Sequence, residues 1–465
     1  ARRADLATVF GAELHLPTPE DLLRGSDEPE EPTGTPDPRA THLLVLARGP
    51  RGYRSLSAAI ADAHLAGGRK GVPRFDLEDL AARADGDWLV LTGCRKGSVR
   101  QALRGDGCPR PAHSPARIPS GRRRPVPCPV HGTEPCTAVR TRDARRELDR
   151  LVDLFGPGNV AVEITDGGDP YDSERNAALA DLAAAAGLPL VATGNVHHAR
   201  PQDGELAAAL ASVRARRSLD DMDGWLPGAA TAHLRSGAEM LVRHRAHPEA
   251  VATAARLAAE CAFDLHLVAP SLPPYPVPEG HDETSWLREL VHVGARERYG
   301  PPEDENVAGA WAQIHHELDI IETLGFPGYF LIVYDIVEFC RRRGILAQGR
   351  GSAANSAVCY ALGITAVDAV RHGLLFERFL APERDGPPDI DVDIESARRE
   401  EVIQHVYERF DRRHAAQVAN VISYRPKSAV RDAARALGYD VGQQDAWSKG
   451  IERWGSLRGA EPDSP

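Results

Sequence analysis

The first half of the chain alternates between short apolar runs and longer stretches that carry apolar residues at helical spacing. Apolar runs bounded by glycine, proline or polar residues predict strands, and the longer stretches predict amphipathic helices. The predicted strands are 8–16, 41–48, 87–93, 159–165 and 188–196, and the predicted helices between them include 54–65, 144–156 and 173–187. This alternation predicts βαβ units with parallel strands and functional residues at the carboxyl ends of the strands.

A proline-rich connector separates this half from a second one. Two amphipathic helices within 226–267 precede the connector, and the residues after it carry further helices, a glycine-rich loop and an acidic strand. A chain of 465 residues accommodates two to three domains at roughly 100–200 residues each. We therefore expect a first domain at 1–267, the connector at 268–281, a second domain at 282–420 and the beginning of a third at 421–465.

The acidic strand shows a clear period of two. Three aspartates alternate there with aliphatic residues, namely Asp389, Asp391 and Asp393 with Ile390, Val392 and Ile394. This period places the carboxylates on one face of a strand and the aliphatic side chains on the other. Because like charges at this spacing repel one another, the pattern favours a hard divalent cation with oxygen ligands, and magnesium is the first choice.

A loop rich in glycine and serine, GRGSAANS at 349–356, precedes the acidic strand. It offers backbone N–H groups unhindered by side chains, the guanidinium of Arg350 and the hydroxyls of Ser352 and Ser356. Such loops bind phosphates, as do helix N-termini. A phosphate cradle followed by paired carboxylates is the equipment for phosphoryl transfer with two metal ions, and a plain turn beside a surface cation site is the alternative.

Composition and charge limit the remaining function classes. The formal net charge of −11 excludes a generally basic coat for nucleic acid, so DNA contacts must come from local patches such as Arg341–Arg343, or Lys427 with Arg431. Seven scattered cysteines do not predict a disulfide framework. No apolar run is long enough to span a membrane, and we expect a cytoplasmic protein without a membrane partner.

The motifs resemble the palm domain of the bacterial C-family DNA polymerases, the family of the polymerase III alpha subunit. They are GFPGYFLIV at 325–333, GRGSAANS at 349–356, LLFERFLAPER at 374–384 and PDIDVDI at 388–394. The sequences GRGSAANS, CYALGITAVDAVRHGLLFERFL and QVANVISYRPKSAVRDAARALGY are similar to the error-prone, damage-induced branch of that family. The resemblance covers nearly the whole chain except an insert around 104–139. It implies a palm with the nucleotidyltransferase fold shared with polymerase beta, followed by the start of a helical thumb.

The resemblance also implies roles for individual residues. Asp389 and Asp391 would be catalytic and hold two Mg²⁺ ions, with Asp393 on the same face as a further metal candidate. The candidates for nucleotide binding are Gly349, Arg350, Gly351, Ser352, Ser356, Arg378 and Arg384, and those for the DNA backbone are Lys427 and Arg431.

The first half resembles the PHP domain, a distorted βα barrel that opens these polymerases and is related to metal-dependent phosphoesterases. Positions similar to those of PHP metal ligands are Glu13, His42, Cys94 and His197. Asn195 stands where such domains have an aspartate, and a neutral amide is a poor substitute for a charged ligand. The His-x-His motif of these domains is missing. We therefore expect a structural PHP domain with a vestigial metal site.

The insert at 104–139 is rich in proline, arginine and glycine and has no periodicity, so it predicts a disordered, solvated surface segment. It contains Cys108, Cys128, His131 and Cys136. Their spacing does not match the paired C-x₂-C pattern of known zinc ribbons or fingers, so the sequence does not favour a zinc site.

Together these features predict an error-prone DNA polymerase that acts in translesion synthesis and damage-induced mutagenesis. Its substrates would be primer–template DNA and deoxynucleoside triphosphates, with a sliding clamp and mutagenesis accessory proteins bound through regions downstream of this chain. Two alternatives are a PHP-type metal-dependent phosphoesterase and a non-catalytic DNA-binding scaffold. The chain begins close to a predicted strand, and the family takes its third catalytic carboxylate from beyond the thumb. We therefore expect a fragment that is inactive alone.

Overall fold

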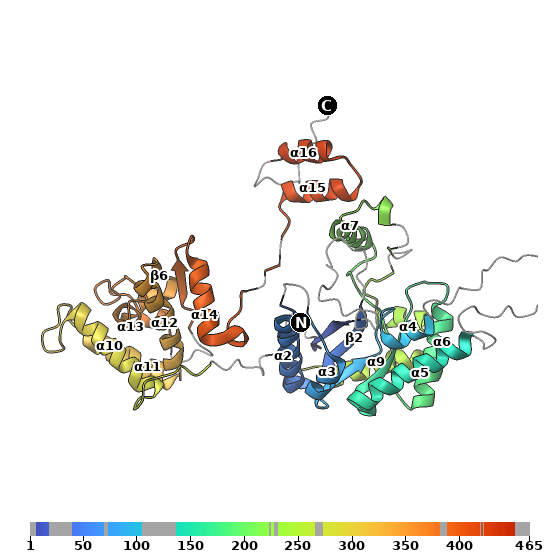
Figure 1. Cartoon of the computed structure of the whole chain (residues 1–465), viewed down its shortest axis with the longest axis horizontal. Helices are drawn as coiled ribbons and strands as arrows, with labels where there is room; N and C mark the ends of the chain where they lie inside the picture. The colour runs from blue at the N-terminus through green and yellow to red at the C-terminus, as the bar shows by residue number, and fades with distance from the viewer. Residues whose placement is uncertain are drawn as a thin grey trace, which may run out of the picture. The chain divides into compact units, whose positions relative to one another are not determined.

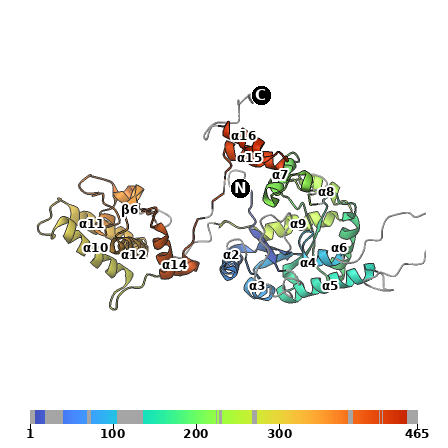
Figure 2. The same cartoon turned by 45° about the horizontal axis from the view of Figure 1, so that its top comes forward.

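A computed structural model of the chain describes residues 6–17, 40–68, 73–104, 136–222, 225–226, 231–265, 273–381, 388–418, 420–421 and 423–451. The chain divides into two compact units, and Figures 1 and 2 show their elements. Unit 1 comprises Ala1–Val268 with Asn420–Pro465, and unit 2 comprises Ala269–Ala419.

A five-stranded sheet in the order β1-β2-β3-β4-β5 forms the centre of unit 1. Its strands are β1 (Gly11–Leu16), β2 (Thr41–Ala47), β3 (Trp88–Leu91), β4 (Val160–Thr165) and β5 (Leu190–Thr193). The pairs β3–β4 and β4–β5 are parallel, whereas β1–β2 and β2–β3 are antiparallel. The prediction of parallel strands is therefore wrong for the first two pairs.

The burial pattern of the strands explains this difference. Every residue of β3 and β4 is buried, which is typical of parallel strands covered on both faces. Along β1 the burial alternates, with Leu14 and Leu16 inside and Glu13 and His15 exposed. This alternation is typical of an antiparallel strand with one solvated face, and the element order alone does not reveal it.

Helices cover both faces of this sheet (Figure 2). The helices of the first half are α2 (Gly49–Gly67), α3 (Leu77–Ala84), α4 (Ser98–Arg104), α5 (Cys136–Phe155), α6 (Asp172–Ala186), α7 (Asp203–Ala215), α8 (Gly237–Arg243) and α9 (Pro248–Cys261). Trp88 and Val90 share one core with α2, α3, α5 and α6. Leu89 and Leu91 point to the opposite core, which includes Leu257 and Cys261 of α9. The alternation of β3 thus divides its side chains between two cores.

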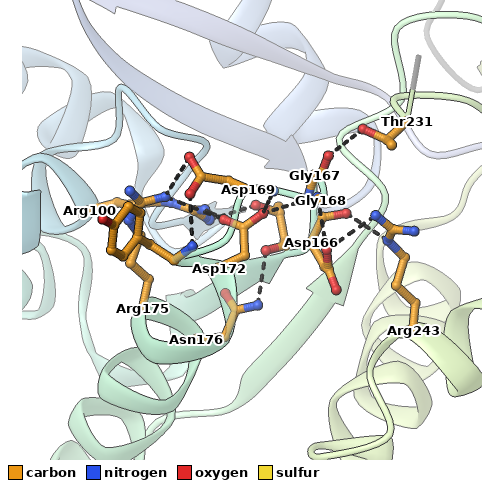
Figure 3. A network of polar contacts seen from close by, with 12 residues as sticks. Arg100, Asp166, Gly167, Gly168, Asp169, Asp172, Arg175, Asn176, Thr231 and Arg243 are labelled. Atoms are coloured by element: carbon orange, nitrogen blue, oxygen red, sulfur yellow. Dashed lines mark hydrogen bonds and ion pairs between the residues drawn. The ribbon is translucent and has the colours of Figure 1, made fainter. Parts of the chain in front are cut away.

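A network of polar contacts fixes the loop that follows β4 (Figure 3). Asp172, at the start of α6, accepts a hydrogen bond from Arg100 of α4 at 2.8 Å, and both side chains are buried. Its second oxygen accepts hydrogen bonds from the backbone N–H groups of Gly167 at 2.8 Å and Asp169 at 3.1 Å. A buried carboxylate with this many donors is well satisfied, so the network holds the carboxyl end of β4 in place.

Two further helices belong to unit 1, α15 (Pro426–Ala436) and α16 (Val441–Lys449). Helix α15 packs against α7 and α16. The backbone N–H of Leu219 donates a hydrogen bond to the carbonyl of Ala436 at 2.7 Å. The segment that we expect to open a thumb therefore clusters with the first half of the chain rather than with unit 2.

Unit 2 is built from helices around a small antiparallel sheet. Its elements are α10 (Glu283–Tyr299), α11 (Ala310–Thr323), α12 (Pro327–Arg343), β6 (Ala347–Arg350), the 3₁₀ turn η5 (Gly351–Asn355), α13 (Ala357–Ala361), the 3₁₀ turn η6 (Phe376–Arg378), β7 (Asp391–Ile394) and α14 (Arg399–His414). One core joins apolar side chains of α10, α11, α12 and α13 with Phe376 and Phe379. The described part of the segment FERFLAPER forms only the turn η6, and Phe376, Phe379 and Leu380 are all buried in this core.

No single helix within the described ranges is long and apolar enough to cross a membrane. Helices α11 and α12 reach the required length and composition only as a pair bent by 116°. Their apolar side chains are buried in the core of unit 2.

Candidate active site

The acidic strand lies beside the strand that leads into the glycine-rich loop. Strands β6 and β7 are antiparallel, and their register pairs Arg350 with Asp391 and Gln348 with Asp393. Along β7 the aspartates are exposed, whereas Val392 and Ile394 are half-buried against neighbouring apolar side chains. The strand therefore presents its carboxylates on the solvent face.

Arg350 lies across two of these carboxylates. Its Nε donates a hydrogen bond to Asp393 Oδ1 at 2.9 Å, and its NH2 group lies 3.7 Å from Asp391 Oδ2. All three side chains are about half exposed or more, at 58%, 67% and 48% for Arg350, Asp393 and Asp391. In water such pairs are weak, so the guanidinium remains available to a stronger anion.

Two glycines shape the loop between β6 and α13. A Cβ atom at Gly349 would lie 2.6 Å from the carbonyl oxygen of Ile364, so no other residue fits without moving the backbone. Gly351 has a φ of +65°, which disfavours other residues, and its Cβ position lies 3.7 Å from Asp391 Oδ2. The backbone of the loop thus approaches the carboxylates at a point where no side chain intervenes.

The two serines of the loop have different surroundings. Ser352 is not buried, and its hydroxyl donates a hydrogen bond to the carbonyl of Asp389 at 3.3 Å, which ties the loop to the acidic segment. Ser356 is fully buried, caps α13 by accepting from the N–H of Cys359, and donates to Glu317 at 2.7 Å. In this structure Ser352 bonds to the backbone of the acidic segment, whereas Ser356 bonds to groups in the interior of unit 2.

Glu317 occupies the N-terminus of α13 from inside the protein. Its buried carboxylate accepts hydrogen bonds from the N–H groups of Ala357 and Val358, both at 2.9 Å, and from Gln313 Nε2 at 3.0 Å. A carboxylate at this position satisfies N–H groups that a bound anion would otherwise use. Sequence reasoning missed Glu317, which looks like an ordinary polar residue of a helix.

The remaining candidates for nucleotide and DNA binding are dispersed. Arg378 is exposed on η6, which adjoins η5. Arg384 lies outside the described residues. Lys427 is exposed on α15 in unit 1, and Arg431 on the same helix donates to Asp445 at 3.0 Å and to Ser448 at 3.2 Å.

A second cluster lies in unit 1 at the edge of the sheet. Among the described residues, Glu13, His15 and His42 form a group whose ligand atoms all lie within 4.8 Å of one another. Hydrogen bonds from His15 and then His42 hold the pKa of the Glu13 carboxyl well below its ordinary value. Sequence reasoning missed His15, although its position two residues after Glu13 on an alternating strand places both on one face, and His15 pairs with His42 in register.

Cys94 joins this cluster through its 3.4 Å contact with His42 Nδ1, and burial raises the pKa of its thiol. His197 follows β5 and is exposed, and in the described part of the chain its side chain is not joined to the other candidates. Asn195 has a φ of 43°, a conformation that asparagine tolerates well. Three of the four predicted PHP ligands therefore come together.

The insert at 104–139 is mostly outside the described residues. Cys108, Cys128 and His131 lie there, and Cys136 begins α5 without a described side chain. The described cysteines, Cys94, Cys261, Cys340 and Cys359, are free thiols.

The donor set formed by Asp391 of β7 and Asp389 just before it fits a hard divalent cation, because exposed carboxylate oxygens are the preferred ligands of such ions. The Asp391 carboxylate and the backbone of Asp389 both border the loop at Gly351 and Ser352. A carboxylate pair beside a glycine-rich loop is typical of sites for nucleotidyl transfer. Residues 285–462 match the family model of the bacterial DNA polymerase III alpha NTPase domain, and residues 1–167 match that of the PHP domain.

Individual relatives extend these matches over nearly the whole chain. The error-prone DNA polymerase of Nocardia farcinica is 54% identical over 492 residues, covering 99% of this chain and 40% of the relative. Those of Mycobacterium tuberculosis and Cutibacterium acnes are 55% and 52% identical, covering 98% and 97% of this chain but 37% and 36% of the relatives. The chain belongs to the family of the bacterial DNA polymerase III alpha subunit, in its error-prone branch. It spans about two fifths of the length of these relatives.

Proposed function

We propose that this chain carries the palm of an error-prone DNA polymerase, which adds deoxynucleotides to a primer opposite a template in translesion synthesis. In this reaction the primer 3′-hydroxyl attacks the α-phosphorus of a deoxynucleoside triphosphate and pyrophosphate leaves. The observation that carries the proposal is the place of the exposed Asp391 carboxylate beside the loop, where its Oδ2 lies 3.7 Å from the position that a Cβ atom of Gly351 would take. We infer that the reaction takes place in the cytoplasm.

Different residues of unit 2 would bind the metal ions and the nucleotide. Asp389 and Asp391 would hold two Mg²⁺ ions, which supply charge neutralisation at the attacking and leaving oxygens when bound. The backbone at Gly351 and the hydroxyl of Ser352 would orient the triphosphate, and Arg350 would neutralise its charge. Arg378 would assist from η6, which adjoins the loop.

DNA and the family's other partners extend beyond this site. Lys427, exposed on α15, would contact the phosphate backbone of the primer–template duplex, and Arg431 would do so only after exchanging its bond with Asp445. We expect the sliding clamp and mutagenesis accessory proteins to bind regions of the polymerase downstream of this chain.

The test is a titration of Mn²⁺, monitored by electron paramagnetic resonance, into the unaltered chain and into the double variant Asp389→Asn/Asp391→Asn. We expect the double variant to lose the tightest site. The matched control is Glu400→Gln, which removes one exposed carboxylate from helix α14 and should leave binding unchanged.

One observation supports a second candidate, a PHP-type phosphoesterase. The cluster of Glu13, His15 and His42 offers three ligand groups in unit 1. If His42→Ala abolishes Mn²⁺ binding while the aspartate double variant binds normally, the phosphoesterase replaces the polymerase as the function of the metal site. If neither variant changes metal binding, a non-catalytic DNA-binding scaffold remains.

A further inference from the structure

The three aspartates of the acidic strand have unequal neighbours. Asp389 and Asp391 border the loop, through the hydrogen bond from Ser352 to Asp389 O and through the close approach of Gly351 to Asp391 Oδ2. Asp393 lies one step further along β7, where its partner in register is Gln348 of β6 rather than a loop residue.

Strand geometry separates the outer two carboxylates. An extended chain rises about 3.3 Å per residue, so the Cα atoms of Asp389, just before β7, and Asp393 can lie up to about 13 Å apart. A catalytic metal pair is only about 4 Å across, and each Mg–O bond is about 2.1 Å. Two neighbouring aspartates on such a strand can share a metal pair directly, whereas the outer two would have to lean toward each other to reach the same pair, so strand geometry favours two of the three as ligands.

The contact that Asp393 does make is with Arg350. Arg350 Nε donates to Asp393 Oδ1 at 2.9 Å, whereas its NH2 group lies 3.7 Å from Asp391, beyond hydrogen-bond distance. A guanidinium has five N–H donors, so a bond through Nε favours one orientation of the group and leaves the donors of the two terminal nitrogens for another anion. Because the pair is exposed, it contributes little to the stability of the fold.

We propose that Asp393 is a positioning residue for Arg350 rather than a third metal ligand. It holds Nε so that the terminal N–H donors of Arg350 face the phosphates of a nucleotide bound at Gly351 and Ser352. This inference rests on the proposed function of the same site. In this inference Asp389 and Asp391 bind the metal ions, whereas Asp393 orients the guanidinium that neutralises the charge of the substrate's phosphates.

The experiment measures two affinities separately in the full 465-residue chain. Mn²⁺ alone is titrated by electron paramagnetic resonance, and inorganic triphosphate is titrated by calorimetry in the presence of EDTA. We expect Asp393→Asn to leave the Mn²⁺ affinity within about twofold and to weaken triphosphate binding by about threefold or more, because asparagine offers Arg350 only a neutral acceptor in place of a charge-assisted one. Asp391→Asn should weaken Mn²⁺ binding instead.

The direction in which the triphosphate affinity changes distinguishes positioning of Arg350 by Asp393 from a simple effect of charge. Asp393→Asn removes a negative charge, so electrostatics alone would tighten the binding of a polyanion, whereas loss of positioning loosens it. In an Arg350→Ala background, Asp393→Asn should no longer weaken triphosphate binding, because the residue that it positions is gone.

Three results would overturn this inference while leaving the proposed function intact. They are a loss of Mn²⁺ affinity in Asp393→Asn equal to that in Asp391→Asn, tighter triphosphate binding in Asp393→Asn, and an undiminished effect of Asp393→Asn when Arg350 is already alanine. An unaltered chain that binds neither Mn²⁺ nor triphosphate would overturn the proposed function and this inference together.

Discussion

The hydroxyl of Ser356 donates a hydrogen bond to the buried carboxylate of Glu317, with 2.7 Å between Oγ and Oε2. The N-terminus of α13 is therefore capped from inside unit 2 by a side chain of α11. The backbone that remains open to a ligand is the part of the loop around Gly351 and Ser352. The N-terminus of a helix that follows a glycine-rich loop is therefore not always the place where phosphate binds.

Burial of Glu317 predicts a pH dependence of stability. Burial raises the pKa of this carboxyl above its ordinary value of 4.5, and hydrogen bonds from Val358, Gln313, Ala357 and Ser356 oppose that shift only in part. Because the pKa is higher in the folded chain, the contribution of the protonated carboxyl to stability is complete below about pH 4.5 and is lost as the pH rises toward the raised pKa.

We expect the free energy of unfolding of the unaltered chain, minus that of Glu317→Gln, to fall as the pH rises from 4.5 to 8. Urea unfolding monitored by circular dichroism at several pH values measures this difference. The control variant Glu303→Gln changes an exposed glutamate of the same unit. A difference that increases with pH would show that the four donors outweigh burial and keep the carboxylate charged.

The local patterns of the acidic strand were predictable from the sequence, because a period of two fixes which side chains share a face. The exposed aspartates and half-buried aliphatic residues of β7 follow from that period alone. The bond from Arg350 to Asp393 was not predictable, because it depends on the register of two strands about forty positions apart. The burial of Ser356 likewise depends on Glu317, which comes from another helix.

The same limit applies in unit 1. The strands and helices follow from apolar runs and helical periodicity, but the antiparallel direction of β1 and β2 depends on how β2 pairs with β1 and with β3. His15 could have been found beside Glu13 from the alternation of β1, since both are polar residues on an otherwise apolar strand. That both approach His42 follows only from the pairing of β1 with β2.

Gly349 predicts a steric effect on stability. A methyl group there would lie 2.6 Å from Ile364 O, the same atom that accepts the hydrogen bond of the Gly349 N–H. Because backbone rather than a flexible side chain must move, Gly349→Ala should lower the free energy of unfolding by about 1–3 kcal/mol. The control is Gly158→Ala, whose added methyl group meets nothing within 4 Å. Equal stability of the two variants in urea unfolding would refute the close approach.

Gly351 predicts an effect on ligand binding. Gly351→Val adds a side chain beside Asp391 at a φ of +65°, so it should weaken triphosphate binding by about tenfold or more if the backbone there contacts phosphate. The matched control is Gly373→Val, because Gly373 has a similar φ of +60° with nothing within 4 Å of its Cβ position. Both variants carry the same kind of backbone strain. A difference between their triphosphate affinities in calorimetric titrations therefore reports the loss of contact at the loop. Unchanged affinity in Gly351→Val, with the circular dichroism spectrum intact, would favour a plain turn.

The number of carboxylates predicts that the 465-residue chain does not extend a primer by itself. If Asp393 positions Arg350, the acidic strand supplies only Asp389 and Asp391 to the metal ions, and the family resemblance implies that the third carboxylate comes from a strand after the thumb. With two carboxylates the ions would be under-coordinated where the primer hydroxyl must lose its proton. Metal ions and triphosphate should still bind.

The measurement is primer extension on a primed template with Mg²⁺ and with Mn²⁺, comparing this chain with a version lengthened downstream by the corresponding region of the Mycobacterium tuberculosis relative. We expect extension only by the longer protein, and loss of that extension in Asp391→Asn. Extension by the 465-residue chain alone that is abolished by Asp391→Asn would show that a residue within it replaces the third carboxylate. The variant Asp393→Asn would then test whether Asp393 is that residue. Complete loss of activity would make Asp393 the third ligand. A raised KM for the nucleotide with kcat retained would keep Asp393 as the partner of Arg350.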